Sequence, residues 1–200
     1  MLLINTEIKE NLKLPYLALL VGMFAISTSA ILIRYSNSEP LVIGTYRQAF
    51  ATLAFLPFIF KDRGAEISSQ SNSTLLEMAL TGILLGAHFS FFITSVKETS
   101  VAASVLLATC HVVYVAILGK IFFGETLSKK AIIGTTIALG GILVLFGGDL
   151  IDNPGNFKGN FYAFVAGVLA GLYYLSGRKL RRTISSVSYT HLRAHETAVN

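Results

Sequence analysis

The stretch that decides the fold to expect is TSVAASVLLATCHVVYVAILGKIFFGETLSKKAIIGTTIALGGILVLF, residues 99–146. It consists of two apolar runs joined by a short polar connector. Each run approaches the roughly 20 mainly apolar residues that a helix needs to cross the core of a bilayer. The stretch therefore predicts two consecutive membrane helices. The first run carries His111 near its middle, and a titratable side chain at that position needs an explanation.

The rest of the chain has the same character. Only 14% of the residues are charged and 53% are hydrophobic, whereas a soluble domain keeps about 25% charged residues. The sequence therefore predicts an all-α membrane protein. Six stretches qualify as transmembrane helices: residues 14–35, 41–60, 75–96, 99–118, 131–148 and 158–177.

The connectors contain signals for helix ends. Pro40 suits the first turn of the second helix, and Thr74 with Glu77 fits a capping box that opens the third. Residues 149–155, DLIDNPG, predict a turn.

Lys and Arg are distributed unequally between the two sides of the predicted bundle. Eleven fall in the N-terminal segment, the second and fourth connectors and the segment after the sixth helix. The opposite connectors hold Lys97 and Lys158 beside four acidic residues. Because cytoplasmic loops are enriched in Lys and Arg, we expect a multi-pass protein of the cell membrane with a cytoplasmic N-terminus.

The net charge of +5 does not indicate a nucleic-acid partner, because the basic residues are confined to connectors and form no basic aromatic surface. The single cysteine, Cys110, excludes a disulfide framework and a Cys-based metal site. No P-loop, GxGxxG, HExxH or paired-carboxylate motif is present in the sequence. We therefore expect no cofactor and no enzymatic activity, the alternative being a membrane-embedded enzyme.

A weak repeat appears between residues that lie 145 positions apart. Four residues of the first helix align with four in and after the sixth: Ala18, Gly22, Ala25 and Arg34 with Ala163, Gly167, Ala170 and Lys179. A sixth helix that restarts the pattern after five helices enters from the opposite side, which is the inverted repeat of many secondary transporters.

The end of the chain, VSYTHLRAHETAVN from about Val187, abandons the apolar pattern. It resembles translated sequencing-adapter DNA, and the alternative is a polar cytoplasmic tail. If it is read-through, the natural chain continues past Ser186.

Several motifs together resemble the EamA repeat of the drug/metabolite transporter superfamily, over roughly residues 14–180. They are AILIRYS (30–36), Pro40, YRQAFA (46–51), HFSFF (88–92), the Thr-Ser-Val-Ala-x-Ser run (99–104), Gly-Glu-x-Leu (124–127) and the glycines at 134, 140 and 141. The resemblance implies ten helices in two inverted five-helix repeats, in a bacterial inner membrane. The expected organisation is a cytoplasmic segment 1–13, a first repeat 14–148, the first helix of a second repeat 149–183 and a non-native tail 187–200.

Two positions depart from the family pattern. Phe92 stands where relatives often carry Trp, and His111 stands where relatives often carry a proline that kinks the fourth helix. The resemblance therefore leaves a bend in this helix in question.

Helical spacing predicts which polar side chains share a face. Ser104, His111 and Tyr114 align on the fourth helix, and Thr81, His88 and Ser95 on the third. Tyr162, Leu169 and Tyr173 align on the sixth. At about 1.5 Å per residue, His88 lies roughly 12 Å and His111 roughly 18 Å from the turn that joins their helices, near mid-membrane. These stripes predict a wet interior, although each Ser, Thr or neutral His could instead bond a nearby carbonyl.

Arg47 lies two turns inside the second helix and keeps its charge. Two alternatives for its counter-charge stay open: a carboxylate of the substrate, or partner groups in a second repeat. The predicted substrate-binding residues are Arg47, His88, Ser104, His111, Tyr114 and Tyr173. The glycine pairs Gly82 with Gly86 and Gly167 with Gly171 predict close helix packing.

The resemblance implies export of small metabolites, amino acids or drug-like compounds by alternating access, with protons as a coupling ion or transport down a gradient. The expected partners are the lipid bilayer, a small solute and either a missing second half or a second copy. The rival hypothesis is a non-transporting fragment, or a single-repeat subunit that needs a partner.

Overall fold

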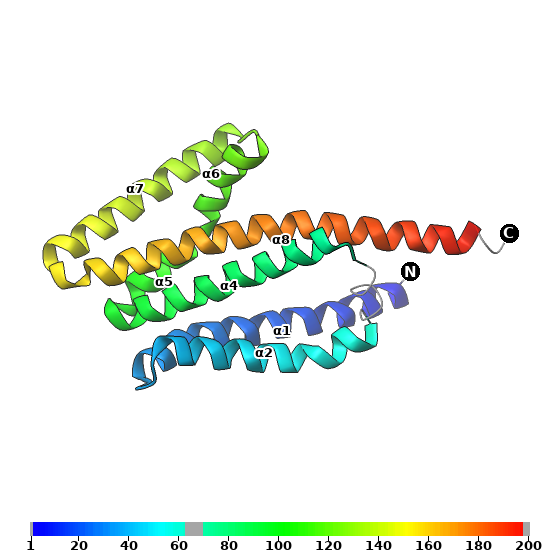
Figure 1. Ribbon diagram of the computed structural model, residues 1–200, viewed down its shortest axis with the longest axis horizontal. Coiled ribbons are helices and arrows are strands. Elements are labelled where there is room, and N and C mark those ends of the chain that lie inside the picture. Colours follow the sequence, from blue (N-terminus) through cyan, green and yellow to red (C-terminus); the bar gives the residue numbers. More distant parts are fainter. Residues whose placement is uncertain (1, 63–69, 198–200) are drawn as a thin grey trace. The chain divides into compact units, whose positions relative to one another are not determined.

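The computed structural model describes the backbone of residues 2–62 and 70–197, and the side chains of 16–57, 70–148, 151 and 153–181. Every element of this part of the chain is helical (Figure 1). The helices are α1 (Leu2–Tyr35), α2 (Pro40–Asp62), α4 (Asn72–Glu98), α5 (Val101–Thr109), α6 (His111–Phe123), α7 (Lys129–Asp152), the 3₁₀ turn η1 (Pro154–Asn156) and α8 (Phe157–Thr197). The chain divides into two units, residues 1–37 with α1 and residues 38–200 with the other helices.

All six predicted stretches contain helix, and within the part of the chain that the structure describes four helices are long and apolar enough to cross a membrane. These are Tyr16–Tyr35, Asn72–Glu98, Val101–Phe123 and Lys129–Gly148. The third comprises α5 and α6 together. Pro40 begins α2, as the sequence predicts.

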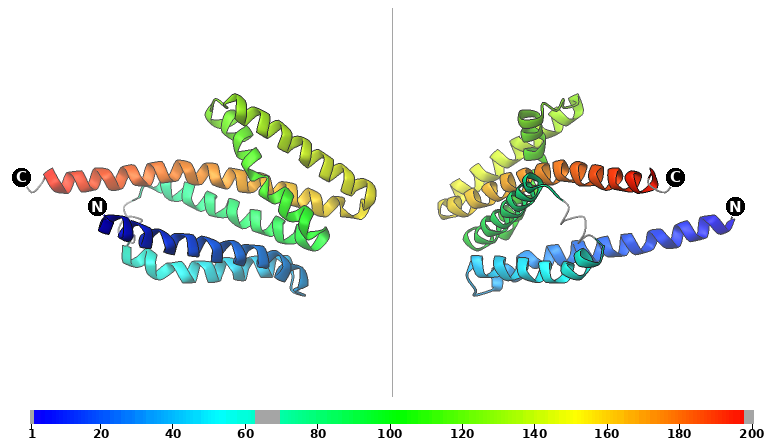
Figure 2. Two further views of the ribbon diagram at one scale, coloured as in Figure 1. Left: turned by 180° about the vertical axis from the view of Figure 1, so that it is seen from behind. Right: turned by 45° about the vertical axis from the view of Figure 1, so that its right-hand side comes forward.

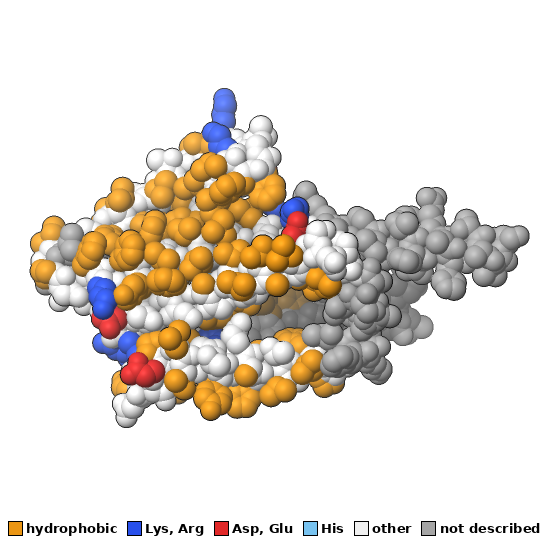
Figure 3. All heavy atoms as spheres, in the orientation of Figure 1, with side chains coloured by type: hydrophobic (Ala, Val, Ile, Leu, Met, Phe, Trp, Pro, Cys, Tyr) orange, Lys and Arg blue, Asp and Glu red, His pale blue; other side chains and the backbone are white. Residues whose placement is uncertain are grey.

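Apolar side chains on these helices are exposed to the surroundings rather than buried within the protein. Val144, Ile137 and Phe122 are 77%, 70% and 65% exposed. Figure 3 shows hydrophobic side chains covering one face of α4, α7 and α8, with charged side chains near helix ends. A surface of this kind is stable only when lipid or further protein covers it.

In the unit of residues 38–200, α8 packs against α4, α5 and α6, and α2 packs against α4. Figures 1 and 2 show α8 running antiparallel beside α4. The core at these contacts includes Ile93, Leu107 and Ala163, whose side chains are fully buried. Small residues on α8 let the helices approach closely.

The small residues of α8 recur every four positions, at Gly159, Ala163, Gly167 and Gly171. A Cβ atom added at Gly159 would lie 2.7 Å from backbone atoms of Glu98 and Thr99. The corresponding atom at Gly171 would lie 3.2 Å from Cβ of Tyr114. This confirms the packing predicted for Gly167 with Gly171.

The packing predicted for Gly82 with Gly86 on α4 is wrong for the described residues. A Cβ at either position would meet no atom within 4 Å. Their small size therefore serves no helix contact in this part of the chain.

The fourth predicted helix is broken between α5 and α6, at Cys110, whose φ and ψ are −64° and 6°. Figure 1 shows the two helices diverging from this point. Cys110 donates to the carbonyl of Leu106 and accepts from Val113, while no backbone hydrogen bond joins His111 to Leu107 in the described residues. The helix therefore bends although this chain has no proline there, which settles the question that His111 raised.

Two predicted boundaries are wrong. The N-cap of α4 is Ser71, whose Oγ accepts the N–H of Thr74 at 3.3 Å, because the helix begins two residues before Thr74. The turn predicted at 149–155 starts later, since α7 continues to Asp152 and Pro154 opens η1. At the other end of the chain, the backbone of α8 stays helical through Thr197.

Candidate functional site

The polar stripe of α4 lies against α8. Thr81 Oγ1 lies 2.5 Å from Ser176 Oγ, and His88 Nδ1 lies 2.8 Å from the carbonyl oxygen of Ala166. Ser95 donates to the carbonyl of Phe92 on its own helix. Each polar group therefore has a protein partner, and His88 bridges two helices at mid-length.

Arg47 reaches this region from α2. Its guanidinium lies over the ring of Phe89 on α4, 4.4 Å from the ring centroid, which is a cation–π contact. The next residue, His88, stacks on Phe92 with ring centroids 6.2 Å apart. Arg47 and His88 thus contact neighbouring aromatic rings of α4, those of Phe89 and Phe92.

Two further predicted residues, Ser104 on α5 and Tyr114 on α6, are buried at the contact with α8. Ser104 is fully buried and Tyr114 is 5% exposed. Neither hydroxyl oxygen has a hydrogen-bond partner among the described residues. Tyr114 packs edge-on against Phe164 of α8, with ring centroids 5.5 Å apart. Buried hydroxyls are normally hydrogen-bonded, so this pair needs a water, an ion or a ligand to explain it.

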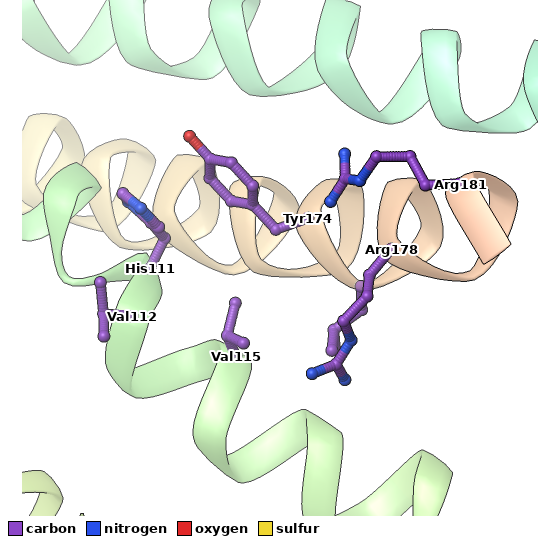
Figure 4. A pocket seen from close by; sticks show the side chains of 7 residues that line it. His111, Val112, Val115, Tyr174, Arg178 and Arg181 are labelled. Atoms are coloured by element: carbon purple, nitrogen blue, oxygen red, sulfur yellow. The ribbon is translucent and has the colours of Figure 1, made fainter. Parts of the chain in front are cut away.

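His111 lies at the start of α6 beside an open cavity of about 280 Å³. Its ring stacks on Tyr174 of α8, with centroids 4.8 Å apart, and its Nδ1 lies 3.4 Å from the carbonyl oxygen of Ala108. Figure 4 shows His111 and Tyr174 side by side in the lining of this cavity, with Arg178 and Arg181 farther along α8.

The remaining predicted residue, Tyr173, is half-buried and packs against Tyr174 with ring centroids 5.4 Å apart. The cavity is lined by Tyr174 rather than by Tyr173. Sequence reasoning missed Tyr174, Arg178 and Arg181 as site residues. Their spacing of four and three residues places them on one helix face, and that signal was present in the sequence.

Residues 13–147 match the model of the EamA-like transporter family. The chain belongs to the EamA-like transporter family. This is a family of transporters rather than of enzymes, and it makes the apolar helices those of a multi-pass membrane protein.

Two curated relatives are similar to this EamA-like chain, and both are named uncharacterized transporters. One, from Archaeoglobus fulgidus, is 29% identical over 122 residues, which cover 60% of this chain and 42% of the relative. The other, from Helicobacter pylori, is 23% identical over 162 residues, which cover 79% of this chain and 52% of the relative. The chain thus spans about half the length of these relatives. No solved structure matches it.

The Gly-Glu-x-Leu motif of this EamA-like chain has a structural explanation. Gly124 ends α6 with φ 63°, a left-handed conformation that favours glycine. The turn directs Glu125 to Arg178 of α8, where Nη2 and Oε1 are 2.7 Å apart. A second ion pair, Lys179 with Glu77 of α4, is 2.6 Å long. The first pair ties α8 to the connector after α6, and the second ties it to α4.

Proposed function

We propose that this chain forms part of a secondary transporter that exports small metabolites, amino acids or drug-like compounds by alternating access. The support is the family match and the polar groups gathered along α8. In secondary transporters with inverted repeats, substrates bind near the midplane where the repeats meet. In the expected organisation, α8 is the first helix of the second repeat, and the polar groups of α4, α5 and α6 lie against it.

The observation that carries this proposal is the pair of buried hydroxyls, Ser104 and Tyr114, without a partner among the described residues. A substrate or a bound water would supply the missing hydrogen bonds. The full set of proposed substrate-binding residues is Arg47, His88, Ser104, His111, Tyr114 and Tyr173. Arg47 supplies a fixed positive charge and favours solutes that bear a carboxylate.

The proposed complete transporter has ten helices in two inverted repeats, with the N-terminus on the cytoplasmic side of a bacterial inner membrane. Residues 14–148 form its first repeat, and residues 149–183 begin the second. The alternative is a fragment or single-repeat subunit that does not transport alone.

A binding experiment tests the substrate class. The melting temperature of the purified chain is measured in detergent with amino acids and with aromatic acids, and each acid is compared with its amide. We expect carboxylates to raise the melting temperature more than amides do, and Arg47→Gln to abolish the difference. Equal effects of acids and amides would contradict the role of Arg47. Flux into proteoliposomes of the chain alone would contradict the fragment alternative.

A further inference from the structure

The groove between α6 and α8 combines an apolar wall with a cationic end. His111, Val112 and Val115 line it from α6, and Tyr174, Arg178 and Arg181 line it from α8. Most of its surface is apolar. Figure 4 shows Arg178 pointing towards α6, while the guanidinium of Arg181 turns back along α8 towards Tyr174.

The two arginines differ in whether a carboxylate pairs with their positive charge. Arg178 forms the ion pair with Glu125 and also lies over Phe123, 5.9 Å from the ring centroid. Arg181 makes no ion pair with any of the described residues. One positive charge in the groove is therefore uncompensated by the part of the protein that the structure describes.

The groove opens on the outside of the helix pair. Val112 is 69% exposed and Tyr174 is 47% exposed, and Ile121 farther along α6 is 66% exposed. In a membrane protein such apolar positions face acyl chains. A molecule in this groove would thus lie beside hydrocarbon, with its polar end at Arg181.

The length of the groove suits one lipid. Seven residues separate Tyr174 from Arg181, which is about 10 Å along a helix. A phosphate at Arg181 would therefore place the first acyl-chain carbons beside Val115 and Tyr174. Basic pockets between transmembrane helices are also places where anionic headgroups bind.

We propose that the groove between α6 and α8 binds one anionic phospholipid, with its phosphate at Arg181 and its acyl chains along Val112 and Val115. The lipid comes from the leaflet that borders the arginine end of α8, which is the cytoplasmic leaflet in the proposed orientation. His111 lines this groove and is also a proposed substrate-binding residue, but the lipid proposal rests on Arg181 and the apolar wall, and its test does not require transport.

The absence of tryptophan from the chain allows a direct test. Val112→Trp places a single fluorophore at the groove, and the variant is reconstituted with brominated phosphatidylglycerol or brominated phosphatidylcholine at equal mole fraction. We expect the anionic lipid to compete about fivefold better for the site, the preference of roughly one arginine for one anionic headgroup. Arg181→Gln in this background should remove the preference.

Two matched controls separate a site from general lipid enrichment. Lys130→Gln removes an exposed cation elsewhere on the protein and should leave the preference intact. Val144→Trp reports an exposed position on α7 and should show no preference. The proposal is overturned if both lipids quench Val112→Trp equally, if Val144→Trp shows the same preference, or if neither lipid quenches Val112→Trp because protein covers the groove.

A second measurement uses the chain without an inserted fluorophore. Native mass spectrometry should detect one retained phosphatidylglycerol on the parent chain and at least fivefold less on Arg181→Gln. Equal retention by the two proteins would also overturn the proposal.

Discussion

Gly167 of α8 faces the ring of Tyr114 on α6 so closely that no side chain fits between them. A Cβ atom at Gly167 would lie 2.6 Å from Cε2 of Tyr114 and 2.8 Å from the carbonyl oxygen of Leu107. The second neighbour is backbone and cannot rotate away. The contact therefore requires glycine, and it holds Tyr114 against α8.

Gly167→Ala should destabilise the packing of α8 on α5 and α6 by about 1–3 kcal/mol, the usual cost of overpacking a close contact. The matched control is Gly86→Ala on α4, where an added Cβ meets nothing within 4 Å. There the better helix propensity of alanine should stabilise by about 0.5–1 kcal/mol. Thermal unfolding in detergent, followed by circular dichroism, measures both. Equal stability of the two variants would show that α8 does not pack here as described.

The ion pair of Glu125 with Arg178 should contribute little to stability, but the effects of substituting its two residues should not be additive. Both side chains are more than a third exposed, at 39% and 36%, and exposed ion pairs contribute at most about 1 kcal/mol. Glu125→Gln and Arg178→Gln should each lower the melting temperature slightly, and the double variant should lose no more than either single one. High salt should diminish the effect. Fully additive losses would show that the two charges do not interact.

The existence of each helix could be predicted from apolar runs alone, because membrane helices leave little choice of secondary structure. The ends of α1 and α8 could not, since these helices extend to Leu2 and Thr197, beyond the apolar runs. Apolar runs could not predict which helix each face contacts. Gly82 with Gly86 and Gly167 with Gly171 carry the same small-residue pattern, yet the structure gives only the second pair a close neighbour. The choice depends on tertiary packing, which a spacing rule on one helix does not contain.

The break at Cys110 shows a different limit. The sequence signal for a bend is a proline, and this chain has none at that position. The helix nevertheless bends at Cys110, where the N–H of Val113 donates to the carbonyl oxygen of Cys110 at 2.9 Å. Likewise, the pairing of His111 with Tyr174 requires knowledge of how α6 and α8 cross, so helical spacing found the histidine and missed its neighbour.

The orientation is a prediction that thiol labelling tests. In a background where Cys110 is replaced, Ser73→Cys and Glu39→Cys each place one exposed thiol at opposite ends of the helices. Ser73 is preferable to Ser71 because Ser71 caps α4. With a cytoplasmic N-terminus, an impermeant reagent should label Glu39→Cys in intact cells and Ser73→Cys only after lysis. The reverse pattern would overturn the orientation.

His111→Pro should be tolerated because the break already frees this position from helical hydrogen bonding. In an intact helix, proline removes a backbone hydrogen bond and costs about 3 kcal/mol or more. The described residues show no hydrogen bond from His111 to Leu107 for it to remove. We expect a loss below about 1 kcal/mol, against about 3 kcal/mol for the control Val115→Pro inside α6. Equal losses would mean that the helix is continuous in the membrane.

The part of His111 in binding is the last feature to test, in the complete transporter with a carboxylate-bearing substrate. Its ring stacks on Tyr174, and Arg178 and Arg181 line the same groove. An imidazole N–H can donate a hydrogen bond to a carboxylate, so His111 should contribute to binding. His111→Gln keeps a polar group and His111→Leu removes it, so binding should weaken more in His111→Leu than in His111→Gln. Equal binding by the parent and both variants would contradict this role, and full activity of His111→Pro would make His111 a tolerated residue at a bend.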